Sequence, residues 1–129
     1  IIDNAEKALA TACEKTGAII TEYTAAPIFL KDNEKAAHEW VIEFETPPEN
    51  LEYFGEMLDN ALKSLNSDYE AKRYHNLMLL LPVIRQVPKG TFYEWFRERG
   101  KLGGQHKVPR LSNDRKYVEG ILELHTKNI

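Results

Sequence analysis

The chain is poor in cysteine: among its 129 residues only Cys13 carries a thiol, so no disulfide can form within it. Apolar runs are short, and none approaches the roughly 18 residues expected of a membrane-spanning helix. Residues 1–17 contain acids and no basic lead, so we expect no signal peptide, and the absent initiator Met suggests a piece of a longer protein. These features predict a cytoplasmic globular domain in a reducing compartment.

Common catalytic and metal-binding motifs are missing as well. The sequence has no G-x-S-x-G, no C-x-x-C and no G-x-x-x-x-G-K-[ST] pattern. Its four histidines show no ligand spacing, so we expect no metal site; they are His38, His75, His106 and His125. Five acids follow the outer faces of predicted elements and are expected to be solvated; they are Glu43, Glu45, Glu49, Glu52 and Glu56.

The net charge of −3 conceals an uneven distribution along the chain. Residues 1–70 hold 15 acids and 5 bases, whereas residues 71–129 hold 5 acids and 12 bases. Two interpretations stay open at this point: the basic half faces an anion or an acidic partner, or the two halves attract each other within one fold.

Hydrophobic periodicity divides the chain into helices and strands. Helical spacing of apolar residues predicts helices over 3–15, 49–65, 67–76, 91–100 and 112–125. Segments rich in β-formers predict strands over 18–30, 38–45 and 78–88. The length of the chain fits one domain, and we expect an α+β fold of two layers. Its small sheet would be mixed or antiparallel, with three to four strands and about four to five helices.

Individual residues refine this prediction. The first two strands should pair as an antiparallel hairpin, and the first of them should be broken or bent near Pro27. The strand over 38–45 alternates in a way typical of a half-buried strand. Pro82 favours a sheet edge or a strand start for the third strand. Ser67 is a candidate helix cap, and Thr91 with Glu94 forms the pattern of a capping box.

The segment 97–116 is the strongest candidate for a function. Seven bases stand there against two acids; the bases are Arg97, Arg99, Lys101, Lys107, Arg110, Arg115 and Lys116. Gly103 and Gly104 allow backbone conformations and close approaches that other residues avoid. Lys107 at such a loop is suited to a phosphate or carboxylate oxygen. The alternative is a flexible basic loop that only leads into a helix.

Five segments of the chain, in the same order, resemble segments of one known protein family. They are "EYTAAP" (22–27), "HEWVIEFE" (38–45), "LDNALKSLNSDYEAKR" (58–73), "VIRQVPKGTFYEWF" (83–96) and "GGQHKVPRL" (103–111). The chain is similar to the C-terminal domain of the acyl acid–amido synthetases, the Gretchen Hagen 3 or auxin-responsive promoter family, and more to its bacterial members than to the plant enzymes. The last two segments are the most specific.

The resemblance implies an adenylate-forming ligase. A carboxylic acid and ATP with magnesium would form an acyl-adenylate and pyrophosphate, and an amine such as an amino acid would then displace AMP. The whole chain, residues 1–129, would be one C-terminal lid domain, its partner the large N-terminal adenylation domain of the same parent chain. That adenylation domain is absent from this sequence, so this chain alone should be inactive and bind no cofactor.

The same resemblance assigns roles to individual residues. Lys107 matches the family's loop lysine and would reach the substrate carboxylate and the α-phosphate of ATP. Arg110 would support the loop or contact phosphate. Gln105 and Tyr23 are weaker candidates for the amine side, with Gly103 and Gly104 as the hinge. For Tyr23 and Arg73, structural packing is the favoured alternative.

Two non-enzymatic functions remain as alternatives. The basic segment 97–116, with Tyr93 and Trp95 nearby, could form a nucleic-acid module, although Trp95 and Phe96 fit a helix core better. A protein-interaction domain is the other alternative. Neither alternative requires a membrane.

Overall fold

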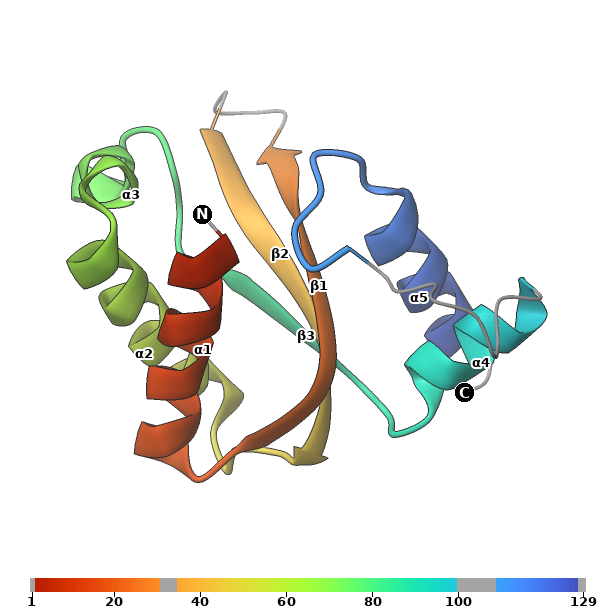
Figure 1. Ribbon diagram of the computed structural model, residues 1–129. Helices are drawn as coiled ribbons and strands as arrows, with labels where there is room; N and C mark the ends of the chain where they lie inside the picture. The colour runs from red at the N-terminus through yellow and green to blue at the C-terminus, as the bar shows by residue number, and fades with distance from the viewer. Residues whose placement is uncertain (1, 31–34, 100–108, 128–129) are drawn as a thin grey trace.

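The computed structural model describes residues 2–30, 35–99 and 109–127 (Figure 1). The elements follow one another as α1 (Ile2–Thr16), β1 (Ile19–Leu30), β2 (Lys35–Thr46), α2 (Leu51–Leu65), α3 (Ser67–Arg73), the short 3₁₀ helix η1 (Tyr74–Asn76), β3 (Val83–Val87), α4 (Thr91–Glu98) and α5 (Lys116–Lys127). This composition confirms the predicted α+β class.

The three strands form one mixed sheet in the order β1-β2-β3. Strands β1 and β2 are antiparallel, with Tyr23 opposite Ile42, as the predicted hairpin requires. Strand β3 runs parallel to β2 at the other edge and begins directly after Pro82, as expected of a proline at a strand start.

The strand predicted over 18–30 is not broken at Pro27, and a bend there stays a prediction. The strand continues through Pro27, and its register shifts fall between Ile19 and Glu22 instead. Because β1 is an edge strand, the missing N–H of a proline removes no bond from the sheet.

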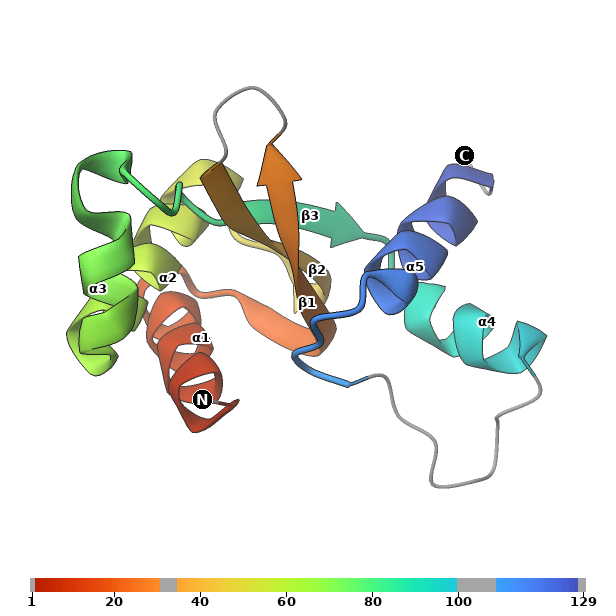
Figure 2. The ribbon, with the colours of Figure 1, turned by 90° about the horizontal axis from the view of Figure 1, so that it is seen from above.

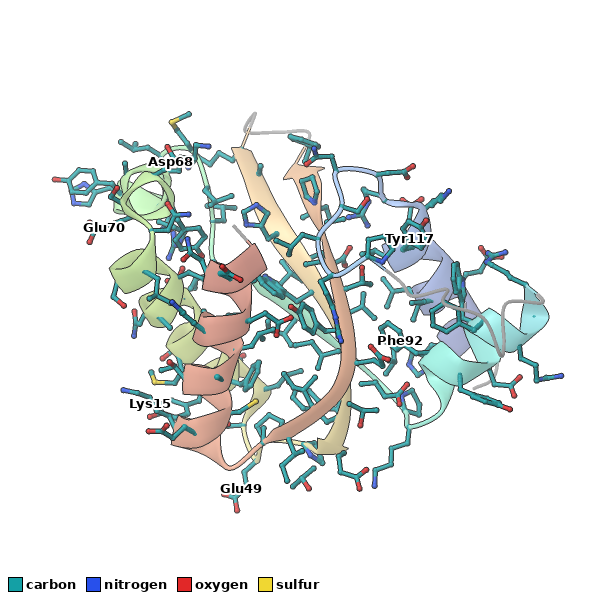
Figure 3. All side chains as sticks on the ribbon, in the orientation of Figure 1. Lys15, Glu49, Asp68, Glu70, Phe92 and Tyr117 are labelled. Atoms are coloured by element: carbon teal, nitrogen blue, oxygen red, sulfur yellow. The ribbon has the colours of Figure 1, made fainter. Side chains whose placement is uncertain are left out.

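Helices lie on both sides of the sheet (Figure 2). Helices α1 and α2 cover one face, where Leu9, Ile42 and Phe54 belong to one core. Helices α4 and α5 pack on the other face, where Phe92 points toward the sheet and joins Val41 in a second core (Figure 3).

Strand β2 is consequently buried on both faces, from Glu39 to Phe44, and the half-buried pattern predicted for it is wrong. Glu43 is among these buried residues, so its predicted solvated position is wrong too. The other four acids of that set are exposed as expected; they are Glu45, Glu49, Glu52 and Glu56.

Two predicted helix caps are displaced by one residue. Asn66, not Ser67, caps α3 by accepting a hydrogen bond from the Tyr69 N–H. Helix α4 begins after Gly90, which adopts a left-handed conformation with φ of 91°. Thr91 and Glu94 form no capping box there. Within the described ranges, no helix is both long and apolar enough to cross a membrane.

Candidate functional site

The segment 109–112 is fixed along the outer edge of β1. The Thr24 hydroxyl donates a 2.7 Å hydrogen bond to the Pro109 carbonyl. The Ala25 N–H donates to the Arg110 carbonyl at 2.9 Å, and the Ser112 N–H donates to the Ala25 carbonyl at 3.0 Å. The end of the segment "GGQHKVPRL", whose Gln105, Lys107, Pro109 and Arg110 form the motif similar to that of the family, is therefore attached to the sheet through both backbone and side-chain groups.

Two of the predicted site residues, Tyr23 and Arg110, meet at this edge. The Arg110 guanidinium lies 4.7 Å from the centre of the Tyr23 ring, within the range of a cation–π contact. It also forms an ion pair with Glu22, with 3.1 Å between the Nη1 and Oε1 atoms. Arg110 thus contributes to holding the segment in place, whatever else it contacts.

The Tyr23 hydroxyl is buried and has no hydrogen-bond partner among the described residues. Burial raises the pKa of this hydroxyl, and the nearby Glu6 carboxylate raises it further, so the group stays protonated. Tyr23 packs on Trp40, with 6.0 Å between ring centres. Its contacts are those of a core residue with one polar end.

Four predicted site residues lie outside the described residues: Gly103, Gly104, Gln105 and Lys107. The described chain stops at Arg99, just after α4, and resumes at Pro109. Their predicted roles remain predictions.

Beyond this segment, Arg115 ties the start of α5 to the sheet. Its guanidinium donates to the Glu39 carboxylate at 2.6 Å and to the Pro27 carbonyl at 3.0 Å. Burial opposes ionisation of Glu39, but hydrogen bonds from Arg115 and Arg85 outweigh it and hold the pKa of this carboxyl below its ordinary value. Sequence reasoning missed Glu39 and Thr24, although an acid within a strongly apolar strand was a visible signal.

The described cations of the basic segment all have partners in this domain. Arg97 pairs with Glu94, Arg99 lies over Trp95, Arg110 pairs with Glu22, Arg115 pairs with Glu39, and Lys116 lies over Tyr117. Among the ion pairs of the described chain, six of nine join a base of residues 71–129 to an acid of residues 1–70. The uneven charge distribution therefore produces electrostatic attraction between the two halves of the chain.

The described part of the chain contains no candidate metal site. No group of three or more His, Cys, Asp or Glu residues there could hold a metal ion.

Comparisons with known proteins give one family. A family model described as the GH3 family C-terminal domain matches residues 3–116. The solved structure of AtGH3.15 acyl acid amido synthetase in complex with 2,4-DB is similar in fold, with a TM-score of 0.70, 17% identity, and coverage of 94% of this chain and 23% of that chain. A structure of GH3.15 acyl acid amido synthetase also has a TM-score of 0.70, with 19% identity and coverage of 97% and 23%. Comparison with curated proteins gives no match.

Proposed function

The chain belongs to the GH3 family as a C-terminal domain, and from this premise we propose that it is the mobile lid of an ATP-dependent acyl acid–amido synthetase. The chain spans about a quarter of the length of the solved relatives, so the remainder of such an enzyme would be its N-terminal adenylation domain. Closure of a lid excludes water from a reactive intermediate and completes the catalytic site.

The observation that carries the proposal is the fixed segment 109–112, which contains the end of the motif. The family match extends over Gln105, Lys107 and Arg110, and Pro109 to Ser112 are bonded to Thr24 and Ala25 on β1. A catalytic side chain has to be held by a rigid scaffold, because small displacements weaken transition-state contacts. The edge of β1 supplies that scaffold on the C-terminal side of Lys107.

Lys107 would provide the chemistry of the first step. A carboxylate oxygen of the acid attacks the α-phosphorus of ATP, the bond to pyrophosphate breaks, and negative charge builds on the phosphoryl oxygens. A lysine ammonium group carried to those oxygens stabilises this charge. In the second step an amine attacks the acyl carbon, with Gln105 on the amine side, and AMP leaves; Tyr23, also a candidate for that side from the sequence, is buried in the core and is given no contact with the amine. Magnesium would accompany ATP, and we assign it no ligand in this domain.

The test uses the full-length synthetase and measures ATP–pyrophosphate exchange that depends on the acid. Lys107→Ala should lower the exchange rate on the order of 10²–10³-fold, the usual loss for one such contact, while leaving ATP binding largely intact. Lys101→Ala is the matched control, because it removes the same charge from the same segment and should leave the rate nearly unchanged. An unchanged rate in Lys107→Ala would refute the role of that lysine.

The isolated 129-residue chain should not catalyse exchange, since the acyl and nucleotide pockets belong to the N-terminal domain. The nucleic-acid alternative gains no support, because the described cations of segment 97–116 already contact acids or aromatic rings of this domain, and Trp95 is buried. The bacterial subtype and the cytoplasmic location remain predictions from the sequence.

A further inference from the structure

The Thr24 side chain is buried in the middle of β1 and is bonded to the segment that follows the motif lysine in the sequence. The residue is 0% exposed, and its hydroxyl donates the 2.7 Å hydrogen bond to the Pro109 carbonyl. Because side chains alternate along a strand, Thr24 lies on the α4–α5 face of β1 with Ala26, a member of the second core. Figures 1 and 2 both show the segment that follows residue 109 beside β1. The hydroxyl is therefore shielded from solvent, and this bond gives it a partner inside the fold.

The Pro109 carbonyl is the point at which the backbone can be held closest to the motif lysine. Proline has no N–H, so this carbonyl is its only backbone hydrogen-bonding group. The other two hydrogen bonds between this segment and β1 are made by Arg110 and Ser112, further along the chain. Among the hydrogen bonds of the described residues, the one from Thr24 is thus the nearest in sequence to Lys107. Two residues span at most about 7 Å, so whatever fixes Pro109 limits where the lysine ammonium group can be carried.

We propose that Thr24 is a positioning residue for the adenylation step, because its hydrogen bond to Pro109 holds the chain from which Lys107 reaches the phosphoryl oxygens. This inference rests on the proposed function, since Thr24 acts through that lysine and touches no substrate. A transition-state contact weakens when the group that makes it is displaced by as little as about 1 Å. The lysine acts on charge that develops during the reaction, so the loss falls on kcat and not on ATP binding.

The first variant is Thr24→Val, which keeps the shape of the side chain and removes the hydroxyl. In the full-length synthetase it should lower kcat for acid-dependent ATP–pyrophosphate exchange about tenfold and leave the KM for ATP within about twofold of the parent value. Thr24→Ser keeps the hydroxyl and should restore most of the rate, although it removes a buried methyl group. An equal loss of rate in Thr24→Ser would refute the hydrogen bond as the cause.

Thr91→Val is the matched control. Thr91 is also buried, and its hydroxyl also donates a 2.7 Å hydrogen bond to a proline carbonyl, that of Pro88. Both valine variants should lower the urea midpoint of the 129-residue chain, because each removes a buried hydrogen bond. Only Thr24→Val should lower the exchange rate of the synthetase. Equal losses of rate in the two valine variants would mean that Thr24 acts through stability alone, and would overturn the proposal.

A double variant separates this inference from the proposed function. If Thr24 acts through Lys107, adding Thr24→Val to Lys107→Ala should lower the exchange rate by less than about twofold, because the contact that Thr24 positions is already gone. A further loss of about tenfold would overturn the positioning role. Loss of rate in Lys107→Ala with none in Thr24→Val would overturn it as well and leave the proposed function standing. An unchanged rate in Lys107→Ala would overturn both.

Amide hydrogen exchange in the 129-residue chain tests the contact without any substrate. The Ala25 and Ser112 N–H groups make the two hydrogen bonds that follow the one from Thr24. Their exchange should be at least about threefold faster in Thr24→Val than in the parent, because local opening of the segment becomes easier, and unchanged in Thr91→Val. Unchanged exchange in Thr24→Val would mean that the segment is held without the hydroxyl, and would overturn the proposal.

Discussion

At the scale of single residues, Arg73 is a charged side chain that is buried and paired within its own domain. It is buried, and its guanidinium forms a two-point ion pair with Asp59, at 2.7 Å from Nε to Oδ1 and 2.9 Å from Nη2 to Oδ2. The Tyr69 hydroxyl donates to the same carboxylate at 2.6 Å. Burial opposes ionisation of Asp59, yet the bonds from Arg73 and Tyr69 keep the pKa of its carboxyl below the ordinary value. Structural packing, the favoured alternative for Arg73, agrees with this geometry.

Arg73→Leu should lower the free energy of unfolding by about 3–5 kcal/mol, because it leaves the Asp59 carboxylate buried without its main partner. Urea denaturation measures this loss. The double variant Arg73→Leu/Asp59→Leu should recover much of it, since apolar side chains can replace a buried pair. Lys72→Ala is the control; it removes an exposed pair with Asp68 and should change stability by less than about 0.5 kcal/mol. A mild effect of Arg73→Leu would mean that water reaches Asp59.

His38 should make stability depend on pH just below neutrality. Because burial lowers its pKa in the folded state below the ordinary 6.5, the unfolded chain takes up this proton first as the pH falls. The buried His38 therefore costs no stability above pH 6.5, and the free energy of unfolding falls as the pH drops from 6.5 toward the pKa of the folded state. Asp59 and Glu39, whose pKa values are also lowered, add a separate loss only at more acidic pH. Urea midpoints above and below pH 6.5 should differ in the parent and differ less in His38→Gln; parallel profiles would contradict the assignment.

At the scale of elements, the first turn of helix α4 is hydrogen-bonded to a side chain of the sheet. The Phe92 N–H, in the first turn, donates a 3.0 Å hydrogen bond to the Glu43 carboxylate of β2. A carboxylate at a helix N-terminus satisfies a free N–H group and interacts favourably with the helix dipole. This contact explains how a buried acid is tolerated, and it aligns α4 with β2.

Glu43→Ala should therefore destabilise the domain by about 1–3 kcal/mol, since it leaves a buried N–H without an acceptor. Glu43→Gln keeps an acceptor oxygen and should cost less. Glu45→Ala, two residues along the strand, is the control because Glu45 is exposed and pairs with the exposed Lys89. Chemical denaturation compares the three variants, and hydrogen exchange at Phe92 should accelerate in Glu43→Ala. Equal losses for Glu43→Ala and Glu45→Ala would contradict the capping role.

Helices α4 and α5 approach closely at Gly120. A methyl group at this position would lie 2.6 Å from the Trp95 Nε1 atom, closer than atoms can pack. At Gly55 in α2, the nearest atom to such a methyl group is Ile84 Cγ1 at 3.4 Å. The two glycines thus differ in their surroundings, although both occupy helix interiors.

Gly120→Ala should lower the unfolding free energy by about 1–2 kcal/mol, because the overlap with Trp95 outweighs the gain in helix propensity of up to about 1 kcal/mol. Gly55→Ala should be nearly neutral or slightly stabilising. Thermal or urea unfolding of both variants measures the two changes in unfolding free energy. If Gly120→Ala were the more stable of the two, the α4–α5 contact would be looser than the structure indicates.

At the scale of the whole molecule, charge attraction links the acidic and basic halves of the chain. The strongest pairs involve the buried acids Glu39 and Asp59, which together contact Arg73, Arg85 and Arg115. The exposed pairs contribute little, because solvent and salt screen them.

Raising sodium chloride from about 0.1 M to about 1 M should therefore change the unfolding free energy by less than about 1 kcal/mol. Glu39→Gln should lower it by about 1–3 kcal/mol at both salt concentrations, because it weakens the hydrogen bonds that Arg85 and Arg115 make to a buried carboxylate. Urea denaturation at the two concentrations measures both values. A much larger salt effect in the parent would mean that the exposed pairs hold the halves together.

Most of the fold could be predicted from local patterns. Helical spacing of apolar residues placed α1, α2 and α5, β-rich segments placed the hairpin, and Pro82 marked the start of β3. The motif segments also indicated the family, because a linear order of residues survives in sequence even where identity to the solved relatives is only 17–19%. Periodicity and turn chemistry are local properties, so the chain alone carries them.

Tertiary structure decided the rest. Only packing on both faces of the sheet buries β2 from Glu39 to Phe44 and turns Glu43 from an expected surface acid into a cap for α4. Only the fold brings Arg110 onto Tyr23, residues 87 positions apart in the chain. The physical reason is that burial and pairing depend on neighbours distant in sequence, which a local pattern does not encode.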